Sequence, residues 1–278
     1  MKKILTVFLV LWAGICSAEQ IPFDEDWKFI QKDVPEAQQV SFSDADWRTL
    51  DLPHDWSVEG KFDRSHPSTD RSGYLPTGIG WYRKTVEVPD DWRGKQIAIQ
   101  FDGVFRNSTV WANGKKLGKR PYGWISFEYD ISDIAKDSAT ITFAVRVDNK
   151  LQHAARWYTG SGIYAHTWIN VRELIHIPNS GIWLRSEGST VTIDTDVRNT
   201  MRRPVECIIK TTILDADGKQ VAIQKTPLKI RQDATEKAAQ TIDISMPNRW
   251  SPKVPYLYRA VSEVQVGSEV WDLSLIHI

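Results

Sequence analysis

The residues best suited to chemistry in this sequence gather between Asp148 and Trp157. Asp148 and Asn149 end an alternating, strand-like run, and Arg156 and Trp157 follow in a glycine-rich loop. Asp and Asn can exchange hydrogen bonds with neighbouring sugar hydroxyls, Arg offers a rigid fork of donors, and Trp offers a flat apolar face. The same residues could instead turn the chain, with Asp148 capping a turn and Arg156 paired to it. Residue types alone leave both interpretations open.

Other catalytic patterns do not occur in the sequence. It contains no HExxH, no Walker loop, no GxSxG elbow and no Cys/His spacing typical of a metal site. We therefore predict no metal ligands in this chain. Turn formation explains three carboxylate pairs, each followed by a tryptophan: Asp24/Asp26, Asp44/Asp46 and Asp90/Asp91.

Composition limits the partners. The 278 residues include 35 Lys+Arg and 35 Asp+Glu, so no net charge favours binding to nucleic acid or an anionic membrane. The 13 tryptophans suit core packing, but proteins that handle sugars also use such rings. Of the two cysteines, Cys207 lies in an apolar run, and we predict that it is a buried small hydrophobic residue.

Residues 1–18 have the pattern of a signal peptide. A basic start is followed by an apolar run from Ile4 to Ile15, and small residues precede a cleavage site after Ala18. The apolar run is too short for a membrane span. We therefore expect an exported protein, periplasmic or extracellular.

The remainder of the chain is dominated by strand patterns. Residues 139–147 alternate, with Ile141, Phe143, Val145 and Val147 on one face. Asn-Gly at 113–114 and Asp-Gly at 217–218 are strong hairpin signals. A turn-rich joint near Pro178 separates residues 20–177 from residues 178–272, and the second segment has the length of an immunoglobulin-type sandwich. The sequence predicts an all-β protein of two sandwiches.

Several specific blocks occur in order along the chain: "FDEDWKFI", "ADWRTLDLPHDWSVEGKFD", "GYLPTGIGWYRKTVEVP", "FDGVFRNSTVWANGKKLGKRPYGWISFEYDIS", "RVDN", "RWYTGSGIY" and "NRWSPKVPYLY". Together they resemble the N-terminal region of glycoside hydrolase family 2, closest to its β-galactosidase-like branch. The resemblance covers about residue 22 to about residue 270, and the segment at 248–258 is similar to a signature of the family's immunoglobulin-like domain.

This resemblance implies a jelly-roll sugar-binding domain over 20–177 and an immunoglobulin-like β-sandwich over 178–272. In the family a (β/α)₈ barrel follows and carries two catalytic glutamates, which in retaining enzymes lie roughly 5–5.5 Å apart. A barrel needs roughly 250 residues. We therefore expect this chain to be an N-terminal fragment, inactive alone, of an enzyme that cleaves terminal β-galactosides.

The resemblance also assigns roles to individual residues. Asp148, with Asn149 beside it, would reach into the barrel's active site and contact the sugar, with a cation near Asp148 in some complete enzymes. Arg156 and Trp157 match the arginine and tryptophan of the following loop. Glycines 160 and 162 would let that loop turn tightly.

Two further expectations concern alternatives and the last residues. The chain could instead be a free-standing carbohydrate-binding protein, or a fragment of a β-glucuronidase or β-mannosidase. Residues 273–278 look like a non-native tail, so the last strand of the second sandwich is expected to be missing, leaving an unpaired sheet edge.

Overall fold

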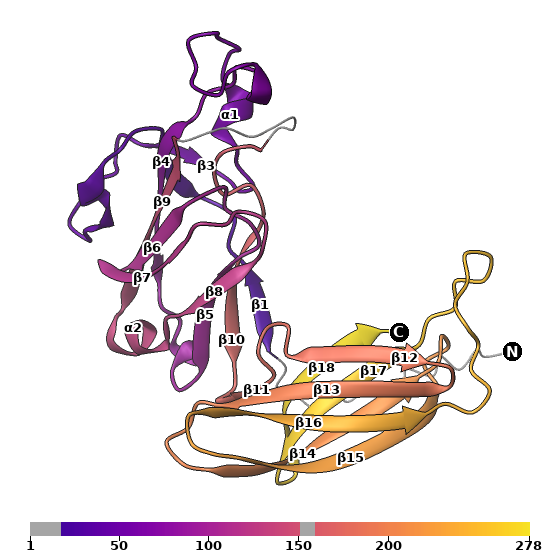
Figure 1. Cartoon of the computed structure of the whole chain (residues 1–278). Coiled ribbons are helices and arrows are strands. Elements are labelled where there is room, and N and C mark those ends of the chain that lie inside the picture. The colour runs from indigo at the N-terminus through magenta and orange to yellow at the C-terminus, as the bar shows by residue number, and fades with distance from the viewer. Residues whose placement is uncertain (1–17, 151–158) are drawn as a thin grey trace, which may run out of the picture. The chain divides into compact units, whose positions relative to one another are not determined.

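The computed structural model describes residues 18–150 and 159–278, and the chain folds as two compact units. One unit comprises residues 19–171, and the other contains residues 172–278. Both are built from β-sheets, so the expected all-β architecture, a jelly-roll sandwich followed by an immunoglobulin-like sandwich, is confirmed (Figure 1). The proposed signal peptide, apart from residue 18, lies outside the described residues.

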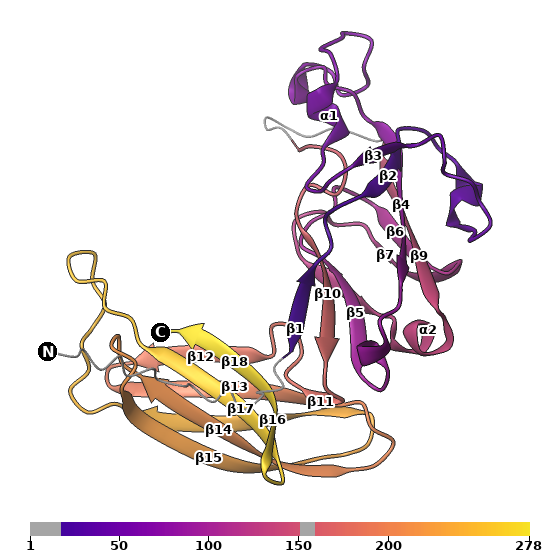
Figure 2. The same ribbon diagram turned by 180° about the vertical axis from the view of Figure 1, so that it is seen from behind.

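The jelly-roll unit consists of two sheets. The six-stranded sheet has the order β3-β2-β4-β9-β6-β7, and the four-stranded sheet has the order β1-β10-β5-β8. The first strand of the unit pairs antiparallel with its last, and both views show β1 beside β10 (Figures 1 and 2). The strands are β1 (Glu19–Pro22), β2 (Trp27–Ile30), β3 (Arg48–Leu50), β4 (Gly78–Glu87), β5 (Gln96–Phe101), β6 (Ser108–Ala112), β7 (Lys115–Arg120), β8 (Phe127–Asp130), β9 (Thr140–Asn149) and β10 (Thr167–Arg172).

Helices in this unit are short and serve as connections. Where the structure describes the chain, no helix is long and apolar enough to cross a membrane. Asp55 caps the first α-helix, because its Oδ1 accepts a hydrogen bond from Ser57 N at 2.9 Å. The helices are α1 (Trp56–Glu59), α2 (Ser132–Asp137) and the 3₁₀ turns Pro35–Gln38, Asp70–Ser72 and Asp90–Trp92.

Alternation along β9 builds the core of the jelly roll. The four residues expected on one face, Ile141, Phe143, Val145 and Val147, are all fully buried. Because side chains alternate across a strand, the opposite face of β9 faces a second apolar cluster that includes Ala144. Three tryptophans of this unit are likewise almost completely buried, so core packing accounts for them: Trp27, Trp56 and Trp81.

Turn chemistry fixes the β6–β7 hairpin as the sequence predicts. Asn113 and Gly114 both have positive φ, 46° and 75°, as a two-residue type I′ turn requires. Ala112 pairs with Lys115 across that turn, so the dipeptide sets the register of the hairpin.

The second unit is a sandwich of two four-stranded sheets. In one, β13 pairs with β11, β12 and β16, and the other has the order β15-β14-β17-β18. Buried aliphatic residues such as Ile193, Ile209 and Val264 fill the space between them. The strands are β11 (Ile175–His176), β12 (Ile182–Glu187), β13 (Thr190–Asn199), β14 (Val205–Leu214), β15 (Gln220–Ile230), β16 (Ala234–Asp243), β17 (Arg259–Val266) and β18 (Glu269–His277).

The edge strand expected to be missing is present. Residues 273–277 belong to β18, which pairs with β17 from Val266↔Glu269 to Arg259↔His277. The expectation was wrong because β17 offers residues 273–277 a row of backbone partners. Their departure from the family pattern did not reveal this pairing. Asp272 within β18 is 2 % exposed and accepts a hydrogen bond from Ile177 N at 2.6 Å.

The state of Cys207 gives a test of this sandwich. The thiol is buried, and burial raises its pKa to about 11, so almost no thiolate exists at neutral pH. In a Cys16→Ala variant, which leaves one thiol, we expect no reaction with a disulfide reagent at pH 8 in the native protein and full reaction in denaturant. Rapid native labelling would contradict the buried position.

Candidate functional site

The candidate site lies where β9 ends. There β9 pairs with the start of β4, Asp148 opposite Ile79 and Asn149 opposite Gly78. The Asp148 side chain is 26 % exposed, and its Oδ2 lies 3.2 Å from a guanidinium nitrogen of Arg146. Lys150 N donates to its Oδ1 at 3.2 Å. Asp148 therefore stands at the rim of the sandwich with part of its carboxylate open to solvent.

A second carboxylate, that of Asp33, holds the Arg146 side chain in place. Its Nε and Nη2 donate to the two oxygens of Asp33, each at 3.0 Å. The hydrogen bond from Arg146 holds the pKa of Asp33 below its usual range. Because this two-point pairing restricts the guanidinium, Arg146 presents a positioned positive charge to Asp148.

Asn149 has a different position from the one expected. The sequence placed it beside Asp148 as a sugar contact, but the structure buries it completely. Its Nδ2 donates to Gly160 O at 2.9 Å and to Ser161 Oγ at 2.6 Å. Adjacent residues on a strand point to opposite faces, so Asn149 faces inward when Asp148 faces the rim. The Asn149 amide therefore holds the loop that follows residue 159.

A hydrogen-bond network continues from Asn149 through the loop. The hydroxyls of Ser161 and Ser57 lie 2.7 Å apart, and Ser57 Oγ donates to Pro76 O at 2.6 Å. Asp55 Oδ1 accepts from Ser161 N at 2.8 Å, in addition to its capping contact. Four chain segments distant in sequence are therefore joined by buried or half-buried polar contacts.

Two glycines make this close approach feasible. Gly160 and Gly162 have φ of 72° and 129°, values that side-chain-bearing residues rarely adopt. A Cβ on Gly162 would lie 2.4 Å from Tyr82 Oη and 2.6 Å from His54 O. The sequence assigned these glycines to a tight turn, and the structure adds that neighbouring atoms leave no space for a side chain.

His54 and Tyr82 are residues that the sequence analysis did not single out. His54 Nδ1 and Tyr82 Oη are joined by a 2.7 Å hydrogen bond, and both residues are buried. Burial lowers the pKa of His54 and raises that of Tyr82 well above its usual value, so both are uncharged near neutral pH. The signal was the "PHDW" segment, whose histidine and aspartate support the loop. The Tyr82 hydroxyl and the His54 carbonyl lie close to Gly162 of the loop.

The other two predicted contacts, Arg156 and Trp157, lie outside the described residues. The described residues do not by themselves provide the cation site considered near Asp148. The Asp148 carboxylate already faces the Arg146 guanidinium, which would repel a cation. Within 18–150 and 159–278, no three His, Cys, Asp or Glu side chains gather as metal ligands.

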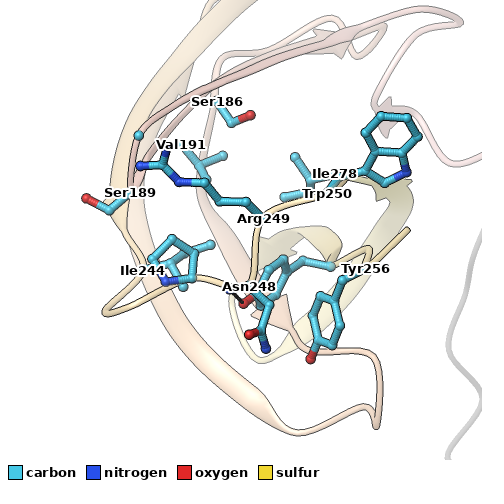
Figure 3. Close-up of a pocket in the computed structure, with 12 residues that line it drawn as sticks. Ser186, Ser189, Val191, Ile244, Asn248, Arg249, Trp250, Tyr256 and Ile278 are labelled. Carbon is cyan, nitrogen blue, oxygen red and sulfur yellow. Dashed lines mark hydrogen bonds between the residues drawn. The ribbon is translucent and has the colours of Figure 1, made fainter. Parts of the chain in front are cut away.

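A separate hollow occurs in the immunoglobulin-like unit. It has a volume of about 270 Å³, and its lining includes Arg249, Tyr256 and Tyr258 (Figure 3). Figure 3 shows Trp250 beside Ile278 at one side of this hollow. The volume is slightly below the roughly 300–1,000 Å³ typical of ligand pockets. Among the described side chains that line it, only that of Arg249 is charged.

Comparison with known proteins identifies the family. Residues 11–170 match the model of the glycosyl hydrolases family 2 sugar-binding domain, and residues 176–274 match a further glycosyl hydrolases family 2 model. The chain belongs to glycoside hydrolase family 2. A β-galactosidase of Bacteroides ovatus, BoGH2A, is 36% identical over 271 residues, covering 93% of this chain and 32% of the relative.

Other relatives agree on the family but differ in named activity. A β-glucuronidase of Formosa agariphila is 28% identical over 276 residues, covering 90% of this chain and 28% of that protein. The crystal structure of a family 2 member from Bacteroides cellulosilyticus superposes with a TM-score of 0.86 at 31% identity, covering 93% of this chain and 35% of that one. This family 2 chain thus spans about a third of the length of the relatives it matches.

Asn149 and Asp148 should respond differently to substitution. Asn149→Ala leaves Gly160 O and Ser161 Oγ without their buried donor, so we expect the free energy of unfolding to fall by about 1–3 kcal/mol. Asp148→Asn keeps the shape and loses a partly exposed ion pair, so we expect a loss of at most about 1 kcal/mol. Urea unfolding of both variants measures the contrast. Equal losses would contradict the inward position of Asn149.

The requirement for glycine at 162 can be tested against a matched glycine. Gly162→Ala introduces both a positive-φ residue and a steric clash, so we expect destabilisation of about 3 kcal/mol or more. Gly94→Ala, in the same unit, has φ of 79° but no atom within 4 Å of the new Cβ, and should cost only about 1–2 kcal/mol. Urea denaturation of the two variants compares them, and similar stabilities would remove the steric argument.

Proposed function

We propose that this chain is the non-catalytic front part of an exported retaining glycoside hydrolase that acts on terminal β-galactosides. The observation that carries the proposal is the part-exposed Asp148 carboxylate at the end of β9, beside a loop that buried contacts hold in place. Such a carboxylate can accept hydrogen bonds from sugar hydroxyls. The match to a protein named β-galactosidase, 36% identical over 271 residues, supports galactose as the sugar, although a relative with a β-glucuronidase name is equally identical over 255 residues.

In this proposal the chain supplies contacts and another domain supplies catalysis. Two glutamates on a (β/α)₈ barrel, encoded beyond this sequence, act as acid/base and nucleophile. Asp148 and Arg156 contact the terminal sugar, and Trp157 is a further candidate contact. Asn149 acts through the loop rather than through the substrate. The leader at 1–18 directs export to the periplasm or the exterior.

The specificity of the enzyme is the part most open to competition. Relatives named β-glucuronidase cover as much of the chain as a β-galactosidase does, so a β-glucuronide is the second candidate substrate. The test uses the complete enzyme, meaning the longer protein that carries the catalytic barrel. Chromogenic β-galactoside, β-glucuronide and β-mannoside are offered to it in parallel, and the relative rates of hydrolysis distinguish the candidate substrates. Preferential turnover of the glucuronide or mannoside would overturn the galactoside assignment.

Activity of matched proteins tests the division of labour. We expect the complete enzyme to hydrolyse the β-galactoside, and we expect the 278-residue chain alone to be inactive. Asp148→Ala in the longer enzyme should lower kcat/KM about 10- to 100-fold, since it removes charge-assisted hydrogen bonds. Asp90→Ala is the control, because that side chain is 94 % exposed in a 3₁₀ turn of the same unit. Turnover by the chain alone would refute the proposal.

A further inference from the structure

An exposed aromatic segment connects β7 to β8 in the jelly-roll unit. Tyr122, Trp124 and Ile125 are 55 %, 46 % and 48 % exposed, although most large apolar side chains of this unit are buried. Apolar side chains that gather on the surface of a soluble protein often mark a binding site. Two of these three side chains are aromatic, and their flat rings can stack on the apolar face of a sugar.

The segment is held rigidly despite its exposure. Tyr164 Oη donates to Gly123 O at 2.6 Å, and Asn107 N donates to Pro121 O at 3.3 Å. A Cβ on Gly123 would lie 2.4 Å from the ring of Phe105. The Trp124 ring lies against that same Phe105 ring, with centroids 5.0 Å apart. The indole is therefore positioned before any ligand arrives, which limits the entropy lost on binding.

Backbone contacts link this aromatic segment to the candidate site. Phe105 and Gly162 exchange two hydrogen bonds of 2.9 Å, so the residue that packs on Trp124 also pairs with the site loop. The next residue, Arg106, accepts from Asp148 N at 3.0 Å through its carbonyl. Asn107 Nδ2 donates to Asp148 O at 3.1 Å. Residues 105–107 thus connect the base of Trp124 directly to the backbone of Asp148.

From this continuity we infer that Trp124 is a second sugar-binding position, one that stacks on the sugar unit next to the one contacted by Asp148. The ligand is a β-linked oligosaccharide of at least two rings, and the role of Trp124 is selectivity for the longer chain. This inference rests on the proposed function, because it needs a terminal sugar at Asp148. Tyr122, two residues earlier on the same connection, adds a second exposed aromatic ring.

Steady-state kinetics of the complete enzyme test the inference, and the release of galactose is measured. The substrates are methyl β-galactoside, which has one ring, and a β-linked galactobiose. For Trp124→Ala we expect KM for galactobiose to rise about tenfold, with kcat little changed and methyl β-galactoside hydrolysis unaffected. Trp124→Tyr keeps a ring and should recover most of the loss. Trp183→Ala is the matched control, an indole 59 % exposed on β12 of the other unit.

The outcomes separate this inference from the function beneath it. Equal losses on both substrates would show that Trp124 packs against another part of the protein, and unchanged kinetics would show no contact; either result overturns the inference alone. Absence of galactoside hydrolysis by the unsubstituted enzyme would overturn the proposed function, and the inference with it.

Discussion

The exposed end of β9 depends on one buried contact, the 2.6 Å hydrogen bond from Asn149 Nδ2 to Ser161 Oγ. An amide buried without partners costs about 1–3 kcal/mol, so Asn149 is stable inside the fold only while the loop occupies its place. The loop in turn needs Asn149, because Gly160 O has its donor there. Strand and loop therefore fix each other, and Asp148 is held at the rim as a consequence.

This arrangement separates two tasks that adjacent residues perform. Asp148 meets solvent and an oriented guanidinium, while Asn149 joins a buried network that reaches Asp55 and Ser57. The uncharged His54–Tyr82 pair lies behind that network and adds no competing charge. A binding surface that is positioned in advance loses less entropy when a ligand binds. The jelly roll thus holds the Asp148 carboxylate at its rim on a rigid support.

The sequence predicted much of the fold because its signals were local. Alternation in residues 139–147 identified the core face of β9, and Asn113-Gly114 fixed a hairpin by its dihedral requirement. It failed at the last strand, since a segment that resembles a tail becomes a strand when β17 offers it backbone partners. For the candidate site, local pattern could not tell which of two neighbouring polar residues at the end of β9 faced outward.

The sequence by itself determined the all-β class, the two sandwiches and the family, because alternation, turn dipeptides and ordered motifs are properties of contiguous residues. Tertiary structure alone decided that Asn149 points inward, that Asp55 holds Ser161, and that Trp124 stands exposed against the Phe105 ring. Those outcomes come from contacts between residues as much as 106 positions apart. Local pattern carries no information about such pairs, which arise only when the sheets pack.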